Sequence, residues 1–338
     1  MIERAELHDA AAKAFPASEL RPQRDSGWQQ IAELGWLLLP LPEDDGGLGL
    51  GRDSAAALQF ELGKALATVP LLPALLSAGA IGRCLGLADK SGVIERAVSG
   101  EFVTCSLLPG YDVSSEGERL NGRMAGVPDA DMASHVLVAT GNVAALVPLT
   151  AGGVTATETP MWDETRRLFD ISFDEVAIDP ALILARGNAA AGLGESLQGE
   201  LLIGLAADSL GGAEAVLAMT VDYLKQRRQF DRPLAMFQAL KHRCADLKTQ
   251  IAAAEALLWA RAADNRATLA DLGALKALAC EVYRFTTEEA IQLHGGIGLT
   301  DEYPAHLFMK RAHLNIALGG DADHWREVAG RAALEALP

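Results

Sequence analysis

Gln292-Leu293-His294-Gly295-Gly296-Ile297-Gly298 closes a long Ala- and Leu-rich stretch of this 338-residue chain. Glycines at a helix end commonly form a C-cap followed by a turn. They also let the backbone approach a ligand closely, and the amide of Gln292 can both donate and accept a hydrogen bond. Helical patterns surround this segment at residues 197–226, 236–263, 269–293 and 304–316, with a terminal helix from about Ala322. Long helices joined by short turns predict an antiparallel bundle.

Upstream of this bundle the pattern of the chain changes twice. In residues 1–98, apolar side chains at three- and four-residue spacing predict helices at 28–37, 54–66 and 72–85. Short β-branched runs bounded by turn residues predict strands at 102–107, 135–139, 143–148 and 168–173. A turn is predicted at 117–122, and 187–194 is interpreted as the glycine-rich connection to the bundle. The sequence therefore predicts a helical domain over 1–98, a β-rich domain over 99–185 and a helical domain over 186–338.

The chain is acidic, with 29 Lys and Arg against 45 Asp and Glu and a net charge of −16. This balance disfavours nucleic acid or an anionic membrane as the main partner. The cysteines have no paired spacing, which favours buried thiols in a reducing compartment; they are Cys84, Cys105, Cys244 and Cys280. Charged residues interrupt the first 25 positions, unlike a signal peptide, and no run of about 18 apolar residues occurs. We expect a cytoplasmic protein without membrane insertion.

A basic segment, Arg227-Arg228-Gln229-Phe230-Asp231-Arg232-Pro233, follows the first long helix of the bundle. Basic residues in a last helical turn complement the helix dipole, and Pro233 would stop the helix. Lys225 adds a further cation to Arg227, Arg228 and Arg232 in an otherwise acidic chain. Such a cluster offers a favourable field to an anionic ligand such as a pyrophosphate. Together with the glycines after Gln292, it indicates a nucleotide-containing cofactor lying across helix ends.

Other classes of site have little support in the sequence. Gly47-Leu48-Gly49-Leu50-Gly51 has neither the spacing nor the preceding strand of a dinucleotide-binding loop. The 7 histidines show no pair at i and i+4 with a third ligand near, so no metal site is expected. No G-x-S-x-G nucleophile elbow occurs, so serine-type acyl transfer is not indicated.

Several motifs, taken in order, resemble those of the acyl-CoA dehydrogenase family. Those in the last domain are Arg227-x-Gln229-Phe230, Phe237-Gln238-Ala239-Leu240-Lys241-His242, Ala245-Asp246, Gln292-x-His294-Gly295-Gly296-Ile297-Gly298 and Glu302-Tyr303-Pro304. Those upstream are Leu34-Gly35-Trp36, Gly46-Gly47-Leu48-Gly49, Glu61-Leu62-Gly63-Lys64 and Asp163-x-Thr165-Arg166. The resemblance covers nearly the whole chain.

The resemblance implies an α+β flavoenzyme fold, with an N-terminal helical domain, a β-barrel-like middle domain and a C-terminal four-helix bundle. In this family FAD is shared across a subunit interface, and its ADP end reaches the bundle of the neighbouring subunit. Carried over by motif, the residues that would contact the ADP part of FAD held mainly by another subunit are Arg227, Gln229, Phe230, Gln292, Gly295 and Gly296. The implied substrate is an acyl-CoA thioester, and the implied acceptor is an electron-transfer flavoprotein or a similar protein.

The residues that would face the chain's own flavin depart from the family pattern. The family's Thr-Glu and Gly-Ser-Asp pattern is replaced by Cys105-Ser106-Leu107-Leu108-Pro109-Gly110-Tyr111. Its Trp-Ile-Thr/Ser strand is replaced by Gly122-Arg123-Met124-Ala125-Gly126. The usual position of the catalytic glutamate aligns with Gly319, and glycine cannot abstract a proton.

Two carboxylates remain as candidates for the base, and the catalytic residue stays unassigned. Some family members place the base on the first bundle helix, where Leu201 aligns and Glu200 stands one residue earlier. One residue turns a side chain by about 100° around a helix, so Glu200 is a weak candidate. The favoured interpretation of Glu200 is a carboxylate stabilised by the dipole in the first turns of a helix. Asp321 aligns with a hydroxyl residue that contacts the cofactor in the family.

The motifs that would face the chain's own flavin are missing, whereas those that would contact a neighbour's FAD are present. This pattern favours a subunit of a heteromeric acyl-CoA dehydrogenase, an α2β2 heterotetramer with a related subunit. This chain would supply the ADP-binding half of a site whose flavin pocket and base lie on that partner. Short subunits of this kind resemble those that oxidise bulky acyl-CoA thioesters such as steroid side chains. Two alternatives stay open: a self-sufficient homo-oligomer that uses Glu200 or Asp321, and a non-catalytic structural subunit that no longer contacts FAD.

Overall fold

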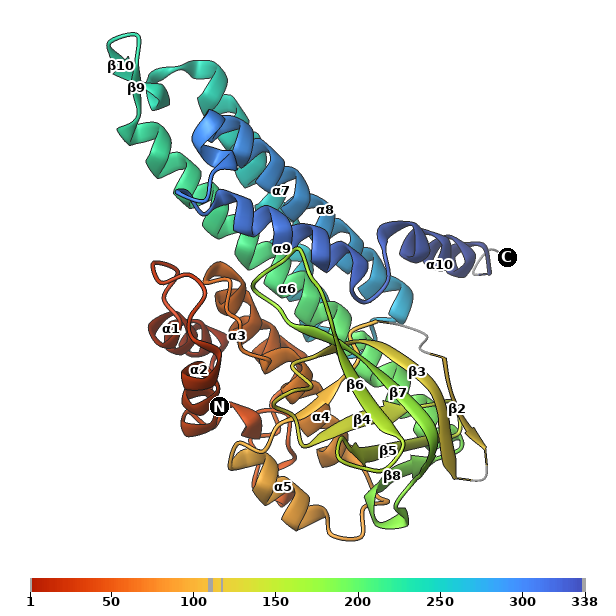
Figure 1. The fold of residues 1–338 in the computed structure, drawn as a ribbon. Helices are drawn as coiled ribbons and strands as arrows, with labels where there is room; N and C mark the ends of the chain where they lie inside the picture. The colour runs from red at the N-terminus through yellow and green to blue at the C-terminus, as the bar shows by residue number, and fades with distance from the viewer. Residues whose placement is uncertain (1, 109–111, 117, 336–338) are drawn as a thin grey trace.

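The computed structural model describes residues 2–108, 112–116 and 118–335 and has the expected α+β architecture (Figure 1). Its N-terminal helices are α1 (Arg4–Ala14), α2 (Arg24–Glu33), α3 (Arg52–Lys64), α4 (Leu71–Arg83) and α5 (Lys90–Val98), with short 3₁₀ turns η1 (Trp36–Leu38) and η2 (Glu43–Asp45). The helix predicted at 28–37 is wrong in its bounds. Gly35 takes φ +68, a left-handed conformation that ends α2, and Trp36–Leu38 forms the separate turn η1.

The middle region consists of two four-stranded sheets that share one core. One sheet has the order β1-β4-β5-β8 and the other β2-β3-β7-β6. The strands are β1 (Val103–Cys105), β2 (Asp112–Glu116), β3 (Arg119–Pro128), β4 (His135–Ala139), β5 (Val143–Pro148), β6 (Val154–Thr159), β7 (Leu168–Ala177) and β8 (Ile183–Arg186), with η3 (Pro180–Leu182) before β8. Side chains from both sheets interlock, such as Met124, Val136 and Ile171, which gives the barrel-like domain.

The strands predicted at 135–139 and 143–148 are confirmed. The turn predicted at 117–122 is wrong in part, because Leu120 and Asn121 already pair with β2 inside strand β3. Gly117 lies outside the described residues, and so do Pro109, Gly110 and Tyr111 of the departing flavin-facing motif.

The C-terminal helices form an elongated bundle that α10 leaves at one end (Figure 1). Its helices are α6 (Asn188–Gln226), α7 (Gln238–Ala263), α8 (Leu269–His294), α9 (Ala305–Ala317) and α10 (Ala322–Glu335), with turns η4 (Leu234–Met236) and η5 (Gly295–Leu299). The connection interpreted at 187–194 is wrong beyond its first residue. Gly187 takes φ +55 as the N-cap, and the following glycines continue the helix.

Helix α6 spans 39 residues and is apolar enough to cross a membrane by length and composition alone. In this structure 83% of its most apolar window is buried by the surrounding helices and strands. It is therefore the core helix around which the other parts of the chain are arranged.

A buried ionic cluster fixes α6 to its neighbours in all three regions. The Arg311 guanidinium donates to Asp163 (3.1 Å), to Asp208 (3.2 Å) and to the carbonyl oxygen of Ala67 (3.0 Å). Asn315 donates to the second oxygen of Asp208 at 2.7 Å. Burial alone would raise the pKa of Asp208, but the charges of Arg166 and Arg311 overcome it and hold that pKa below its usual value.

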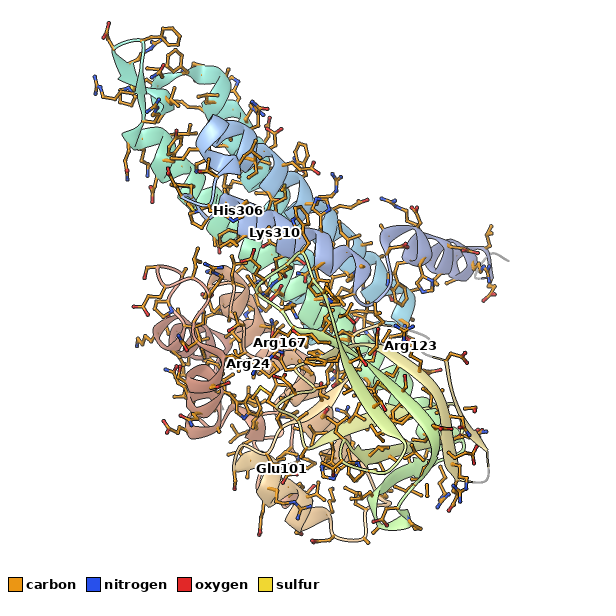
Figure 2. The ribbon with its side chains drawn as sticks, in the orientation of Figure 1. Arg24, Glu101, Arg123, Arg167, His306 and Lys310 are labelled. Carbon is orange, nitrogen blue, oxygen red and sulfur yellow. The ribbon has the colours of Figure 1, made fainter. Side chains whose placement is uncertain are left out.

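A second, more exposed ionic contact joins the N-terminal helices to the sheets. Arg24 on α2 and Arg167, just before β7, lie close together in Figure 2 and both pair with Asp131. The Nη1 of Arg24 is 3.0 Å from Asp131 Oδ1. The two contacts together hold the helical and β-rich regions in one arrangement around α6.

Candidate functional site

The basic segment forms a hairpin at the far end of the bundle (Figure 1). Helix α6 ends at Gln226, and β9 (Arg228–Gln229) pairs with β10 (Arg232–Pro233). Lys225 lies in the last turn of α6, as interpreted, but Arg227, Arg228 and Arg232 lie beyond the helix, and Pro233 lies in a strand rather than ending the helix. The turn between the strands places Phe230 at φ +53 and Asp231 at φ +63, where side chains other than glycine are uncommon.

Arg227, which lies between α6 and the hairpin, and Phe230 at the hairpin turn are both exposed. Phe230 is 83% exposed. Arg228 donates to the carbonyl oxygen of Asp231 at 2.8 Å, and Arg232 stacks on the Phe237 ring at 4.0 Å. The side chain of Arg227 makes no hydrogen bond or ion pair with any described residue. Arg227 is consequently the arginine of this segment whose side chain no described residue engages, which leaves it available to an external anion.

The glycine-rich turn lies at the same end of the bundle. Tyr223, one helical turn before Arg227, donates its hydroxyl to the carbonyl oxygen of His294 at 3.2 Å, and their rings are 4.6 Å apart. Gly295 takes φ +67, and a Cβ on either Gly295 or Gly296 would meet open space. Gln292 is exposed beside them. The structure thus brings the two predicted cofactor segments to one open surface through a tyrosine–histidine contact that the sequence did not indicate.

The two alignment positions of the catalytic base meet in a second place, a cleft between α6, β1 and the end of α9. Leu201 and Gly319 both line this Leu201–Gly319 cleft, whose volume is about 220 Å³. Its other described lining residues include Leu76, Leu108, Leu137, Leu197, Cys105, Ser106 and Gln198. None of the described lining residues is a carboxylate or histidine, and burial raises the pKa of the Cys105 thiol to about 12. The described lining offers no group that would accept a proton near neutral pH.

Backbone and side-chain hydrogen bonds hold Gly319 in a conformation that would strain a larger residue. Its N–H donates to the carbonyl oxygen of Leu107 at 2.7 Å, and its own carbonyl oxygen accepts from Trp325 Nε1 at 2.8 Å. Its φ is +67, and a Cβ would lie 2.8 Å from a methyl carbon of Leu205. A glutamate at this position would have to displace Leu205.

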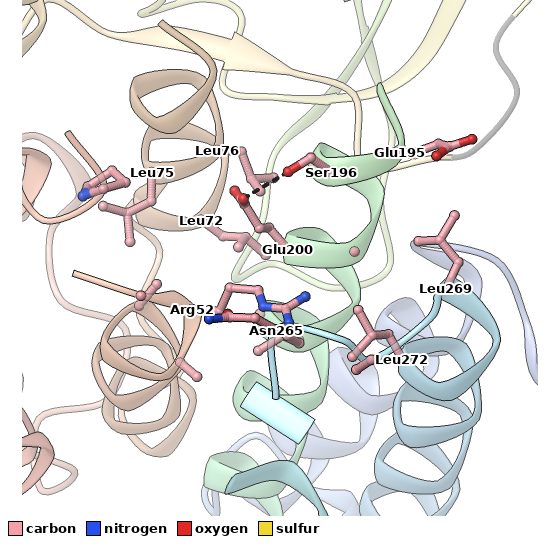
Figure 3. A pocket seen from close by; sticks show the side chains of 18 of the residues that line it. Arg52, Leu72, Leu75, Leu76, Glu195, Ser196, Glu200, Asn265, Leu269 and Leu272 are labelled. Carbon is pink, nitrogen blue, oxygen red and sulfur yellow. Dashed lines mark hydrogen bonds between the residues drawn. The ribbon is translucent and has the colours of Figure 1, made fainter. Parts of the chain in front are cut away.

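Both remaining carboxylates are engaged elsewhere. Glu200 is 2.8 Å from Arg83, accepts from Ser196 at 3.3 Å, and lines a different cavity from Leu201 (Figure 3). Asp321 is exposed and caps α10 by accepting from the N–H of His324 at 2.8 Å. Neither Glu200 nor Asp321 lines the Leu201–Gly319 cleft.

The chain fits one part of a dinucleotide better than the other. The open, basic hairpin and the glycine turn suit a pyrophosphate, because Arg227 and the backbone can approach it. In the Leu201–Gly319 cleft, Ser106 is already used internally: it donates to the carbonyl oxygen of Ala125 at 2.7 Å and accepts from the N–H of Leu108 at 3.0 Å. The volume of the cleft is also below ~300 Å³, the lower end of the range of volumes found for ligand pockets. The described residues therefore do not fit a flavin ring there.

The buried cluster around Asp208 is the feature that sequence inspection missed most clearly. In the sequence, Asp163, Thr165 and Arg166 stand out only as part of a family-like motif. Asp208 is the one charged residue among the apolar and small residues 201–213, and that interruption was the available signal.

Comparisons with known proteins identify the family. Residues 2–101 match the acyl-CoA dehydrogenase N-terminal domain, and residues 202–334 match the C-terminal domain. The chain is 34% identical to the acyl-CoA dehydrogenase IpdE2 of Mycobacterium tuberculosis over 90% of this chain and 85% of that protein. It is 31% identical to the acyl-CoA dehydrogenase FadE28 of the same organism, over 91% and 92% of the two chains.

Solved structures agree with this assignment. The Tcur3481-Tcur3483 steroid ACAD G363A variant superposes with a TM-score of 0.86, at 29% identity and over 98% of each chain. The ChsE4-ChsE5 complex from Mycobacterium tuberculosis superposes with a TM-score of 0.85, at 26% identity, over 100% of this chain and 99% of that chain. This chain belongs to the acyl-CoA dehydrogenase family, whose cofactor is FAD.

Proposed function

We propose that this chain is a subunit of a heteromeric acyl-CoA dehydrogenase and supplies the ADP-binding half of an FAD site. The enzyme would carry out the α,β-dehydrogenation of an acyl-CoA thioester, with a related subunit contributing the flavin pocket and the base. FAD, when bound, supplies the hydride acceptor of this reaction. An electron-transfer flavoprotein or a similar protein would reoxidise it, and an α2β2 assembly in the cytoplasm is the expected form.

One observation carries the proposal: the Leu201–Gly319 cleft has no proton acceptor among its described residues. Removal of the α-proton of a thioester needs a positioned base, which typically contributes ~10²–10⁴ in rate. A homo-oligomer of this chain would lack that base in every copy. The base is therefore assigned to a different subunit.

The residues proposed to bind the ADP part of FAD support the same assignment of roles to the two subunits. Arg227, Phe230 and the turn at Gly295 face outward at the end of the bundle, where a cofactor held by another subunit would be able to reach them. The unusual backbone of Phe230 and Asp231 is the kind of strain found at ligand-binding positions. A purely structural subunit would not need these features together.

The proposed substrate is a bulky acyl-CoA such as a steroid side-chain thioester. The similarity to a steroid acyl-CoA dehydrogenase at 29% identity supports this substrate class. The two-protein titles of two similar solved structures support the heteromeric assembly.

Expression of the chain with and without its partner tests the proposal. Alone, it should be colourless or unstable, because its own flavin pocket is missing. Co-purified from the native host with its partner, it should carry about one FAD per heterodimer. A yellow and active preparation of this chain alone would overturn the proposal, and a colourless partner complex would favour a structural role.

A further inference from the structure

Helix α6 begins with about three turns that are packed much less tightly than the rest of the helix. We call these residues, 188–198, the α6 strap. Within the strap only Ala190 is buried, whereas every residue from Leu201 to Ala213 is buried. Leu193 and Leu197 are partly buried against the same core as Ala190. Because a segment with few buried apolar contacts opens at a low free-energy cost, the strap depends mainly on its own helical hydrogen bonds.

The sequence of the strap also gives its helix little support. Gly187, the N-cap, supplies no side-chain hydrogen bond to the first turn, and that turn has no acidic residue to complement the helix dipole. Gly192 and Gly194 each lower the helix equilibrium constant about fivefold relative to Ala. Packing does not require either glycine, because a Cβ on each would meet nothing within 4 Å outside the helix itself. The helical form of the strap is therefore favoured only weakly.

Both ends of the strap are anchored to other parts of the chain. The N–H of Gly187 donates to the carbonyl oxygen of Asn142, in the turn between β4 and β5, at 2.8 Å. At the other end, Gly199 lies so close to α8 that a Cβ would stand 3.1 Å from a methyl carbon of Leu272. The backbone between these two points can therefore unwind while both ends stay in place.

The strap contributes to the walls of three hollow spaces. Gly192 and Ser196 line a cavity of about 570 Å³ between α3, α4, α6 and the start of α8, which Gln59 also lines (Figure 3). The same two strap residues line a groove of about 570 Å³ beside β8. Gly194 and Leu197 line the Leu201–Gly319 cleft. Unwinding of the strap would remove a shared wall of all three spaces.

We propose that the α6 strap is a gate, which unwinds and re-forms as a local unit and, when unwound, joins the groove, the cavity and the cleft into one space. With the helix formed, the cleft has a volume of only about 220 Å³. With the strap unwound, a molecule from solvent reaches the interior through the groove, which is lined by the 99% exposed Leu85. The gate depends on the contacts of the strap itself and not on which subunit holds the flavin or the base.

The native cysteines can report the opening. Cys84 lines the groove and Cys105 lines the cleft. Burial raises the pKa of both thiols, to about 12 for Cys105, so both should react slowly while the strap is helical. Cys280 is buried in the bundle and reports global unfolding, whereas the half-buried Cys244 is the directly labelled reference. Site-resolved labelling with N-ethylmaleimide, on the full-length chain with whatever subunit co-purifies with it, measures each rate.

Cys84 and Cys105 should be labelled at least about tenfold faster than Cys280, because local opening costs less free energy than global unfolding. The two rates should also change together, since one movement uncovers both thiols. If Cys105 reacts no faster than Cys280, or if Cys84 and Cys105 respond independently to the substitutions below, the proposal is overturned.

Substitutions in the strap test whether it is the part that moves. Gly192→Ala and Gly194→Ala should each slow the labelling of both thiols about fivefold, because Ala favours the helix and the added Cβ meets nothing. Ala191→Gly, at an exposed strap position, should accelerate labelling by about the same factor. Gly330→Ala on α10, where a Cβ also meets nothing, is the matched control and should change both rates less than about twofold. Rates that ignore the strap substitutions, or that respond equally to Gly330→Ala, would show that the thiols are reached by another route, and the proposal fails.

Discussion

Single residues decide which parts of the chemistry this chain can perform. Gly319 and Leu201 occupy the positions where the family resemblance predicts a base, and both line an apolar cleft. Glu200, next to Leu201 in sequence, is turned toward Arg83 in another cavity. Successive side chains on a helix point about 100° apart, so the carboxylate of Glu200 does not point into the cleft that Leu201 lines.

The roles of the two candidate carboxylates can be tested by neutralising each one. In the partner complex, Glu200→Gln and Asp321→Asn should each leave turnover within about tenfold of wild type, because neither side chain lines the cleft. Removal of a glutamate base in the partner should abolish turnover. FAD content and melting temperature serve as controls for folding. A loss of a hundredfold or more by Glu200→Gln with FAD retained would show that this chain carries the base, because a positioned base contributes ~10²–10⁴.

Elements of secondary structure position the residues that we propose contact the ADP part of FAD. The β9–β10 hairpin extends beyond α6, and η5 turns at the end of α8. Two segments that are 62 to 71 positions apart in sequence therefore reach one end of the bundle. The contact between Tyr223 and His294 holds the two helix ends together. The two neighbouring arginines differ in their contacts. Arg228 donates to the carbonyl oxygen of Asp231 within the hairpin, whereas the Arg227 side chain contacts no described hydrogen-bond partner.

Arg227→Ala should weaken FAD retention by the complex more than Arg228→Ala does. The Arg227 side chain is available to a pyrophosphate, whereas Arg228 donates within the hairpin to Asp231. Loss of a charge-assisted hydrogen bond costs about 1.5–3 kcal/mol, or one to two decades in affinity. Flavin release during dialysis or dilution measures the effect. Equal, less than about twofold effects of both variants would contradict the assignment of Arg227.

On the scale of the whole molecule, the buried ionic cluster holds the three regions together around α6. Arg311 and Asp208 contact the loop after α3, the segment before β7 and the core of the bundle. Charges buried in this way are strongly coupled, because each depends on its partners for compensation. The arrangement also keeps α6 and α9 in the register that brings Leu201 beside Gly319.

Asp208→Asn should destabilise the protein by about 3–5 kcal/mol, because it leaves the buried guanidinium groups of Arg166 and Arg311 with too little negative charge. Denaturant unfolding measures this change in the free energy of unfolding. Asp222→Asn is the matched control on the same helix: its carboxylate is exposed and pairs with Lys225 at 2.9 Å. It should change stability by less than about 1 kcal/mol. Similar effects of the two variants would refute the structural role of Asp208.

The same aspartate predicts a dependence of stability on pH. The pKa of Asp208 is lowered in the folded state, so its contribution is fully present above its unfolded pKa of about 3.9. It is lost as the pH falls through the lower folded value. The difference in unfolding free energy between wild type and Asp208→Asn should accordingly be constant near neutral pH and shrink below about pH 4. A difference that persists unchanged in acid would contradict this assignment.

The sequence by itself determined the family, the helical–β–helical order and the motifs around Arg227 and Gly295, because local periodicity and short motifs carry that information. It also predicted that a glycine, Gly319, stands where the family resemblance would place the base. Only the tertiary structure decided where Glu200 points, that residues 188–194 continue α6, and that the arginines lie on a hairpin. It alone assembled the cavity around Gln59 from α3, α4, α6 and α8. Side-chain direction and cavity shape depend on how helices rotate and pack against distant segments, which local patterns do not encode.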